Sequence, residues 1–306
     1  MIRIITYIII SIFTIATSLA QVKSEEININ NQAIQLPGTL TYSEGKSPLI
    51  IWIHGSGGVD RNGNAPQYIK QFREAINKKG IAFFSYDKRT ANPKNALFLK
   101  EDGVLITDFV SDAKEVVNHF KDDKRFSEII LTGHSQGSLI AMMALDNVDK
   151  YISIAGAGET IDKTLVRQIT AQSAEFGKLT ATYLKELKET GEIKEVNPNL
   201  MSLFAPQNQP FLTSWIELNP LEEIKKVKIP TLIINGDKDL QVQIADAENL
   251  KTAKPDAELV IIKNMNHVLK RIEKDEDNMK SYMSADFLIS KELINTITTF
   301  VLKSNN

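Results

Sequence analysis

The chain has 306 residues, with 36 lysines and arginines against 38 aspartates and glutamates and a formal net charge of −2. Because the basic residues are spread along the chain, the composition argues against nucleic-acid binding. Hydrophobic residues make up 42% and charged residues 24%, which is the usual mixture of a globular protein. The length suffices for one large α/β domain with an insertion, or for two small domains.

The first 20 residues have the layout of a secretory signal peptide. Arg3 supplies a positive charge, residues 4–15 are almost wholly apolar, and the small Ala20 precedes the polar Gln21. We therefore expect residues 1–20 to be cleaved after Ala20 and the protein to be exported, to the periplasm or the exterior. A permanent N-terminal anchor is the alternative, although the apolar stretch is shorter than the roughly 20 residues of a membrane span. Beyond this segment we expect no membrane association.

Residues 21–158 are expected to form the first part of an α/β core. Residues 26–30 alternate apolar and polar side chains as a half-exposed strand does, and residues 39–42, after Pro37-Gly38, are the expected hairpin partner. Apolar runs and helical spacing predict further strands at 49–53, 81–86, 129–132 and 151–156, and helices at 68–79 and 104–120.

Strand patterns disappear from residue 159 to residue 227. Helical stretches such as 179–188 alternate there with a segment rich in Pro, Asn and Gln, so we expect an inserted, mainly helical cap over the edge of the sheet. The core resumes over residues 228–306. Its expected elements are strands at 231–235 and 258–262 and helices at 244–250 and 292–301. Apolar strands that alternate with helices predict a mainly parallel sheet covered by helices on both faces.

A nucleophile elbow is predicted around Ser135. An apolar strand leads into Gly133-His134-Ser135-Gln136-Gly137, and helical residues follow. The turn between strand and helix is so tight that side chains two residues before and two after the serine would collide, so both positions are glycine. Ser135 would then project from the apex as the nucleophile, with the N–H of Gln136 directed at the substrate oxyanion. An ordinary Gly-rich turn before a helix is the alternative interpretation.

A serine hydroxyl needs a base within hydrogen-bond reach, and the chain has four histidines. His54 begins a His-Gly turn and is expected to brace that loop. His134 lies inside the elbow and faces away from the serine, and His119 falls at the end of a surface helix. His267 directly follows the last strand, at the sheet edge where the loops of such folds form active sites. His267 is therefore the predicted base.

The histidine in turn needs a carboxylate that holds its tautomer and stabilises the imidazolium. Asp237 and Asp239 both follow the preceding strand, and an N-cap of the next helix is the alternative role for Asp239. With either acid, the order serine, aspartate, histidine matches the arrangement of α/β-hydrolases and neither the chymotrypsin nor the subtilisin order.

From about residue 26 to its end, the chain resembles an α/β-hydrolase, and more narrowly the EstD-like bacterial carboxylesterases. The resemblance rests on the His-Gly-Ser-Gly loop of residues 54–64, the Tyr-Asp-Lys-Arg strand end of residues 86–89 and the Gly-His-Ser-x-Gly elbow. In that family the acid lies three residues after a glycine and three before an aliphatic residue. Gly236 and Val242 fit this spacing around Asp239, so the resemblance favours Asp239 over Asp237.

The resemblance also implies an oxyanion hole made of the backbone N–H groups of Ser56 and Gln136. The function that it implies is a serine hydrolase for carboxylic esters with small to medium acyl groups, acting on a small-molecule ester without a cofactor or a metal. Two alternatives stay open, a serine peptidase for short peptides or aminoacyl amides and a catalytically silent binding protein on a hydrolase scaffold. The peptidase would need carboxylates in the cap that grip a free amine. The acids available there have the pattern of a solvated helix face, and they are Glu186, Glu189, Glu192 and Glu195.

Two further sets of residues have open roles. Asp87 and Arg89 lie two residues apart beside the loop of Asp60 and Arg61, where a structural ion-pair network is favoured over a substrate contact. Apolar residues of the cap could either line an acyl pocket or pack the cap onto the core. These residues are Leu200, Leu203, Phe204, Phe211, Leu212 and Trp215.

Overall fold

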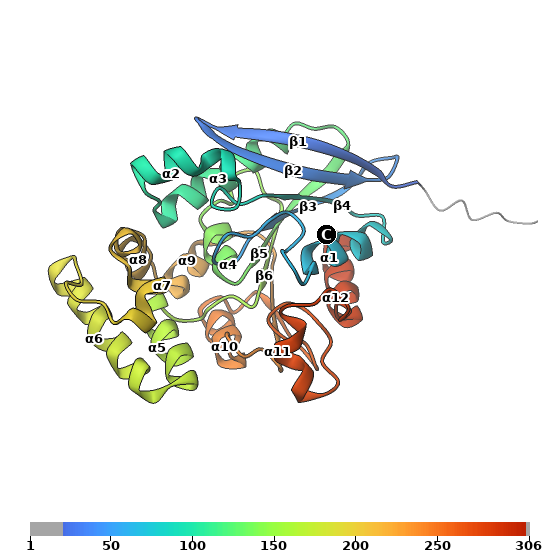
Figure 1. Ribbon diagram of the computed structural model, residues 1–306. Coiled ribbons are helices and arrows are strands. Elements are labelled where there is room, and N and C mark those ends of the chain that lie inside the picture. The colour runs from blue at the N-terminus through green and yellow to red at the C-terminus, as the bar shows by residue number, and fades with distance from the viewer. Residues whose placement is uncertain (1–20, 304–306) are drawn as a thin grey trace, which may run out of the picture.

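A computed structural model describes residues 21–303, and its centre is an eight-stranded sheet (Figure 1). The strand order is β1-β2-β4-β3-β5-β6-β7-β8. The hairpin of β1 and β2 joins β4 in an antiparallel manner, and all other neighbours are parallel. The strands are β1 (Lys23–Asn31), β2 (Ile34–Tyr42), β3 (Ser47–Ile53), β4 (Ala82–Tyr86), β5 (Phe126–His134), β6 (Lys150–Ile154), β7 (Thr231–Gly236) and β8 (Glu258–Ile262).

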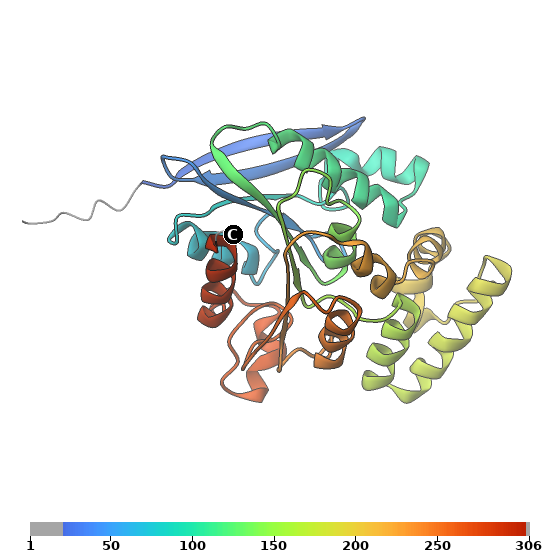
Figure 2. The same ribbon diagram turned by 180° about the vertical axis from the view of Figure 1, so that it is seen from behind.

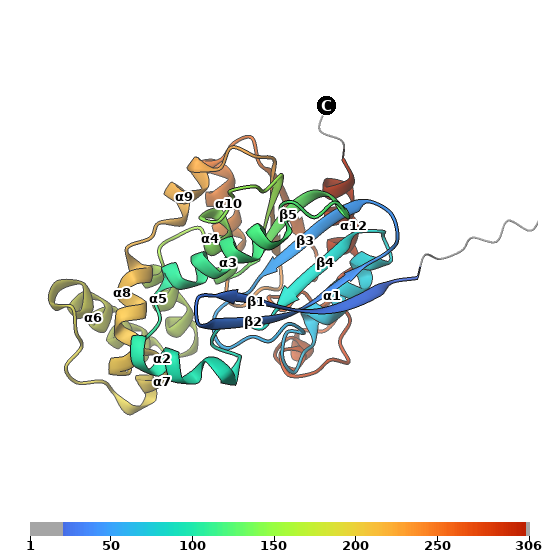
Figure 3. The same cartoon turned by 90° about the horizontal axis from the view of Figure 1, so that it is seen from above.

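Helices cover both faces of this sheet (Figure 3). Apolar side chains of α1 (Tyr68–Asn77) and α12 (Lys291–Leu302) pack on one face, with Phe72 and Ile297 fully buried among them. On the other face lie α3 (Ile106–Phe120), α4 (Gln136–Met142), α9 (Pro220–Lys226) and α10 (Ile244–Ala253). The predicted class, a mainly parallel sheet between two helical layers, is confirmed.

The first hairpin forms as expected but is longer than the sequence pattern indicated. Its turn lies at Gln32, whose φ is 53°, so β2 begins before Pro37-Gly38 and runs through both residues. Pro37 lies opposite Asn28 in the ladder. Glycine is needed at position 38 because a Cβ there would lie 2.4 Å from the Cζ of Phe84. A Pro-Gly pair that suggests a turn therefore lies inside a strand.

Only helical elements fill the chain between β6 and β7. They are α5 (Ile161–Gln172), α6 (Ala174–Thr190), α7 (Met201–Phe204), α8 (Gln209–Ile216), α9 and the short 3₁₀ turns Pro198–Leu200 and Pro206–Asn208. Helices α5 and α6 form an antiparallel pair that projects to one side of the sheet (Figures 1 and 2). They share an apolar cluster of their own with α7 and α8, whereas Ile224 of α9 belongs to the core of the sheet.

A short helix, α2 (Ala96–Asp102), was not predicted, and it precedes α3 beside the cap (Figure 3). The loop between β8 and α12 carries one further short helix, α11 (Asn278–Ser281). The predicted signal peptide, residues 1–20, lies outside the described residues. Within residues 21–303, none of the helices combines the length and apolar character needed to traverse a bilayer.

A buried lysine fastens the last helix to the sheet. Lys150, at the start of β6, is 2% exposed, and its Nζ donates to the backbone carbonyls of Val301 and Lys303 and to the carboxylate of Glu128, each at 2.9 Å. These carbonyls belong to the end of α12, where backbone acceptors have no partner within the helix. The contact lies at the amino end of the parallel strands, opposite to the end where the predicted site residues lie.

Candidate active site

Ser135 occupies the sharp turn between β5 and α4. Its φ of 54° and ψ of −122° lie outside the regions that L-residues favour, and its N–H donates to the carbonyl of Ile154 at 2.9 Å. The side chain is half-buried and lines a cavity. Strained backbone of this kind is maintained only where the surroundings enforce it.

The two glycines of the elbow provide that enforcement. A Cβ on Gly133 would lie 2.2 Å from the carbonyl oxygen of Gly137, and a Cβ on Gly137 would lie 2.2 Å from the carbonyl oxygen of Ile53 at the end of β3. Any larger residue at either position would force the backbones of β3, β5 and α4 apart. The steric reason inferred from the sequence is therefore confirmed.

Asp239 and His267 lie in contact after β7 and β8. The Nδ1 atom of His267 lies 2.8 Å from the Oδ2 atom of Asp239, whose side chain is only 1% exposed. The other carboxylate oxygen, Oδ1, accepts from the backbone N–H groups of Gln241 at 2.8 Å and Val242 at 2.9 Å. The carboxylate is thus fixed in one orientation, and its remaining acceptor faces the imidazole.

The other candidate acid has a different partner. Asp237 is exposed, and its Oδ1 accepts from the backbone N–H of Asn264 at 2.6 Å. The alternative N-cap role of Asp239 is wrong, because α10 begins only at Ile244 and its N-cap residue is Gln243. Of the two aspartates, the structure brings Asp239 against His267.

A second histidine links the elbow to the loop of His267. The Nε2 atom of His134 lies 2.8 Å from the backbone oxygen of His267, and the two ring centroids are 4.8 Å apart. Among the described residues, no hydrogen bond joins the Ser135 hydroxyl to the His267 ring. Such contacts are often long before substrate binds.

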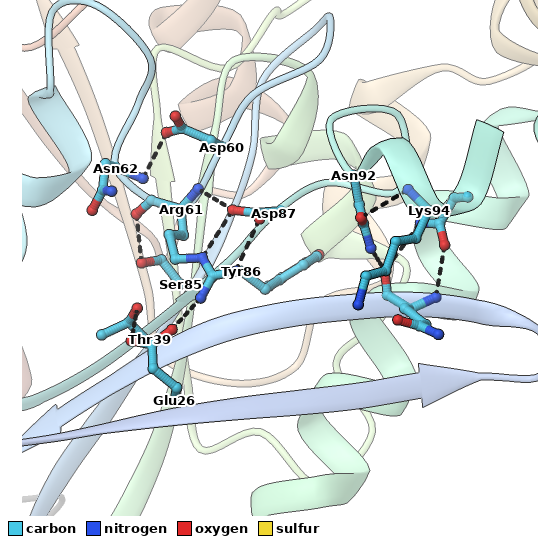
Figure 4. Close-up of polar contacts among 12 residues, drawn as sticks. Glu26, Thr39, Asp60, Arg61, Asn62, Ser85, Tyr86, Asp87, Asn92 and Lys94 are labelled. Carbon is cyan, nitrogen blue, oxygen red and sulfur yellow. Dashed lines mark hydrogen bonds and ion pairs between the residues drawn. The ribbon is translucent and has the colours of Figure 1, made fainter.

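The loop that carries Ser56 is fastened to the end of β4. His54 bonds through Nε2 to the backbone oxygen of Tyr86, which is the bracing role expected for it. Arg61 donates from its backbone N, Nε and Nη2 to the carboxylate of Asp87, at 2.9 Å in each case, and also contacts Glu26 of β1 (Figure 4). Asp87 therefore belongs to a structural ion-pair network, as favoured from the sequence.

Arg89 takes part in a separate network. Its Nε lies 2.7 Å from Oδ2 of Asp112 and its Nη2 lies 2.8 Å from Oδ1, which is a bidentate pair with a carboxylate that is 1% exposed. Asp108 adds a longer contact at 3.4 Å. The arginine thus ties the strand end to α3.

Lys88 is the residue of this region that the sequence reasoning missed. It is 4% exposed, and its Nζ donates to the carbonyl of Gly55 and to Oε1 of Gln136, both at 2.7 Å. The ring centroid of Phe109 lies 4.2 Å from the same nitrogen. Burial lowers the pKa of Lys88 to about 7, although the negative charge of Asp112 opposes this. The Tyr-Asp-Lys-Arg run contained the signal, but a lysine between two charged residues has the pattern of a solvated surface.

A cavity of about 890 Å³ lies between the core and the cap, and Ser56, Ser135 and Gln136 line it. The apolar cap residues whose role the sequence left undecided fall into two groups. Leu203, Phe211, Leu212 and Trp215 line the cavity, whereas Leu200 and Phe204 pack inside the cap. Further apolar walls come from Leu99 of α2, Val104 in the loop after it, Phe109 of α3 and Leu139 of α4.

Among the side chains that the structure describes, no group of three or more His, Asp or Glu residues has the arrangement of a metal site. What the geometry offers is an elbow serine beside an apolar cavity and a buried aspartate–histidine pair on the neighbouring loops. That combination can support nucleophilic catalysis with general-base assistance.

Comparison with known proteins identifies the family. A family model described as BD-FAE matches residues 34–253. The chain belongs to the BD-FAE family. It is 26% identical to the esterase EstD of Thermotoga maritima over 263 residues, which cover 81% of this chain and 60% of EstD. The chain thus spans less than two thirds of the length of that curated relative.

Solved structures share the fold. The Est1E protein of Butyrivibrio proteoclasticus superposes with a TM-score of 0.57 at 18% identity, covering 91% of this chain and 99% of the other. An acylaminoacyl peptidase of Pyrococcus horikoshii gives a TM-score of 0.61 at 16% identity, covering 94% of this chain and 43% of the other. This member of the BD-FAE family therefore has the α/β-hydrolase fold.

Burial of His54 predicts a loss of stability in mild acid. Burial, assisted by the charge of Lys88, lowers its pKa from 6.5 to about 4. Between these values the unfolded chain binds a proton that the folded chain does not, so the free energy of unfolding falls as the pH falls. Urea denaturation of His54→Gln should show a decrease between pH 7 and pH 5 that is smaller than that of the wild type by about 2 kcal/mol. His119→Gln, at an exposed position, is the control, and equal slopes for His54→Gln and the wild type would contradict the prediction.

Proposed function

We propose that this protein is an exported serine hydrolase that cleaves carboxylic esters with small to medium acyl groups. The observation that carries the proposal is the strained Ser135 on the wall of an apolar cavity, with the Asp239–His267 pair on the adjoining loops. The name of EstD, an esterase, supports the reaction class. A structure described as ferulic acid bound to Est1E supports a carboxylic acid as the product side of such a site.

In this mechanism the hydroxyl oxygen of Ser135 attacks the ester carbonyl, and His267 accepts the hydroxyl proton. Asp239 holds the imidazole through Nδ1, so that Nε2 is the atom that exchanges protons with the substrate. The backbone N–H groups of Ser56 and Gln136 stabilise the oxyanion of the tetrahedral intermediate. His267 returns the proton to the leaving alcohol, and water then releases the acid from the acyl-enzyme.

The lining of the cavity favours an ester over a peptide with a free amine. Among the lining residues whose side chains the structure describes, Glu159 is the one carboxylate, and its Oε1 lies 2.7 Å from Nη1 of Arg167. An ammonium group entering the cavity would compete with that arginine or remain unpaired, which is costly in an apolar site. The cap acids considered for a peptidase do not line the cavity. The strained elbow of Ser135 and the Asp239–His267 pair likewise give no support to a silent binding protein.

The assignment of the acid is tested by comparing two substitutions. Asp239→Asn should lower kcat by roughly a hundredfold or more, because the histidine loses the partner that fixes its tautomer. Asp237→Asn, two residues earlier in the chain and exposed, is the matched control and should keep most of the activity. Turnover of an aryl ester measures both, with Ser135→Ala as the inactive reference. Reversed effects of the two aspartate variants, or near wild-type turnover in Ser135→Ala, would contradict the mechanism.

The substrate class is tested with aryl esters of increasing acyl length beside aminoacyl anilides. We expect kcat/KM to rise over the first few acyl carbons, because each buried methylene contributes about 0.8 kcal/mol, and then to fall as the cavity fills. Trp215→Ala should flatten this profile, since Trp215 lines the cavity. A panel in which the anilides exceed every ester would favour the peptidase instead.

Export is part of the same proposal, and it rests on the sequence of residues 1–20. Protein made in a secreting host should begin at Gln21 when its N-terminus is sequenced. An intact Met1 in a membrane fraction would support the anchored alternative.

A further inference from the structure

Lys88 contacts both segments that supply the proposed oxyanion donors. Its ammonium donates to the carbonyl of Gly55 and to the side-chain oxygen of Gln136, each at 2.7 Å. We propose that Lys88 is a positioning residue that orients the backbone N–H groups of Ser56 and Gln136 toward the substrate oxyanion. This inference rests on the proposed function.

The peptide unit between Gly55 and Ser56 connects the lysine to the first oxyanion donor. The carbonyl of Gly55 and the N–H of Ser56 belong to the same planar group and point in opposite directions across a trans bond. A cation fixed on the oxygen therefore fixes the direction of the N–H. It also stabilises the amide dipole in the orientation that presents a positive end to the reacting carbonyl oxygen. Gly57, with a φ of 85°, follows directly, so the loop has backbone freedom that the lysine restricts.

The second donor is held through a side chain. Gln136 is 5% exposed and begins α4, so its own N–H lies at the end of the helix where backbone donors have no partner within the helix. The hydrogen bond from Lys88 to Oε1 fixes the Gln136 side chain against the Ser56 loop. One ammonium group therefore couples the two halves of the oxyanion hole, which follow β3 and β5 in the chain.

Lys88 itself lines the cavity, but the groups around its ammonium favour a role through these segments over a direct contact with the substrate. Two of its three ammonium protons are used by Gly55 and Gln136, and the Phe109 ring faces the nitrogen at 4.2 Å. The carboxylate whose charge acts on Lys88 is that of Asp112, which Arg89 holds in bidentate contact. A buried cation without a directly paired carboxylate is expensive to retain. The hydrogen bonds from Lys88 to Gly55 and Gln136 offset part of this cost, and they act on the two segments that carry the oxyanion donors.

The experiment uses the full chain with Lys88→Met, which keeps the unbranched apolar part of the side chain at nearly the same length and removes the ammonium. The rate at which a fluorophosphonate labels Ser135 and the kinetics of an aryl ester are both measured. We expect the labelling rate and kcat to fall by about tenfold to a hundredfold, somewhat less than the effect of deleting an oxyanion donor outright. KM should change by less than about twofold, because the oxyanion forms only in the transition state.

Lys150→Met is the matched control. It also removes a buried ammonium bonded to backbone carbonyls, but at the opposite end of the sheet, so its folded form should label at the wild-type rate. Gln136→Met removes only the second contact and keeps the lysine. It should reduce the labelling rate by less than Lys88→Met, and it keeps the proposal testable if Lys88→Met does not fold.

The outcomes separate this inference from the proposed function. Wild-type protein that is labelled but hydrolyses no ester would contradict the ester substrate, while the labelling rates would still decide the role of Lys88. Wild-type labelling in Lys88→Met, or in Gln136→Met when the first variant is unfolded, would overturn the inference. A raised KM with unchanged kcat would overturn it as well, because Lys88 would then bind the substrate directly.

Discussion

The site depends on how closely three backbone segments approach one another at the elbow. The first turn of α4 lies against the carbonyl of Ile53 at the end of β3, and Gly133 lies against the carbonyl of Gly137 in the same turn. Hydrogen atoms are the only substituents that fit at these two positions. Because β3 leads directly into the loop of Ser56, the same contact that forces the Ser135 backbone into a strained conformation also sets the distance between the serine and that loop.

The loop beside the elbow is held by directed polar contacts from the end of β4. Three consecutive residues at the end of β4 each fasten the loop after β3. Tyr86 uses its backbone oxygen, Asp87 its carboxylate and Lys88 its ammonium. Hydrogen bonds have directional requirements that apolar contacts lack. A loop held in this way keeps its peptide planes oriented, which is the property that stabilisation of a developing charge requires.

The sequence predicted those features that depend on local patterns. Glycines around Ser135 have a steric cause that acts within a few residues, and His267 could be chosen because it follows the last strand. The strand pairing of residues 26–30 was also predictable, but the extent of β2 was not, because Gly38 is required by Phe84 on a strand that lies elsewhere in the sequence.

The features that were missed depend on contacts between distant segments. Helix α2 has seven residues and no side-chain cap at its start, so it lacks the signals that identify longer helices. The division of the cap residues, with Phe211 on the cavity and Phe204 inside the cap, could not be predicted, because helical periodicity identifies a buried face without identifying what buries it. Lys88 was missed because its partners are distant in the sequence: Gly55 follows β3, and Gln136 begins α4.

The position of the cap in the sheet has a consequence for how such a protein can diversify. Strands β6 and β7 are adjacent and in fixed register, with Ile152 opposite Leu232, although helices α5 to α9 intervene in the chain. The entropic cost of closing an insertion rises only slowly with its length. Helices can therefore be added, shortened or exchanged at this point while the serine on one side and the aspartate–histidine pair on the other keep their spacing. Selection can thus reshape the cavity without rebuilding the groups proposed to perform the reaction.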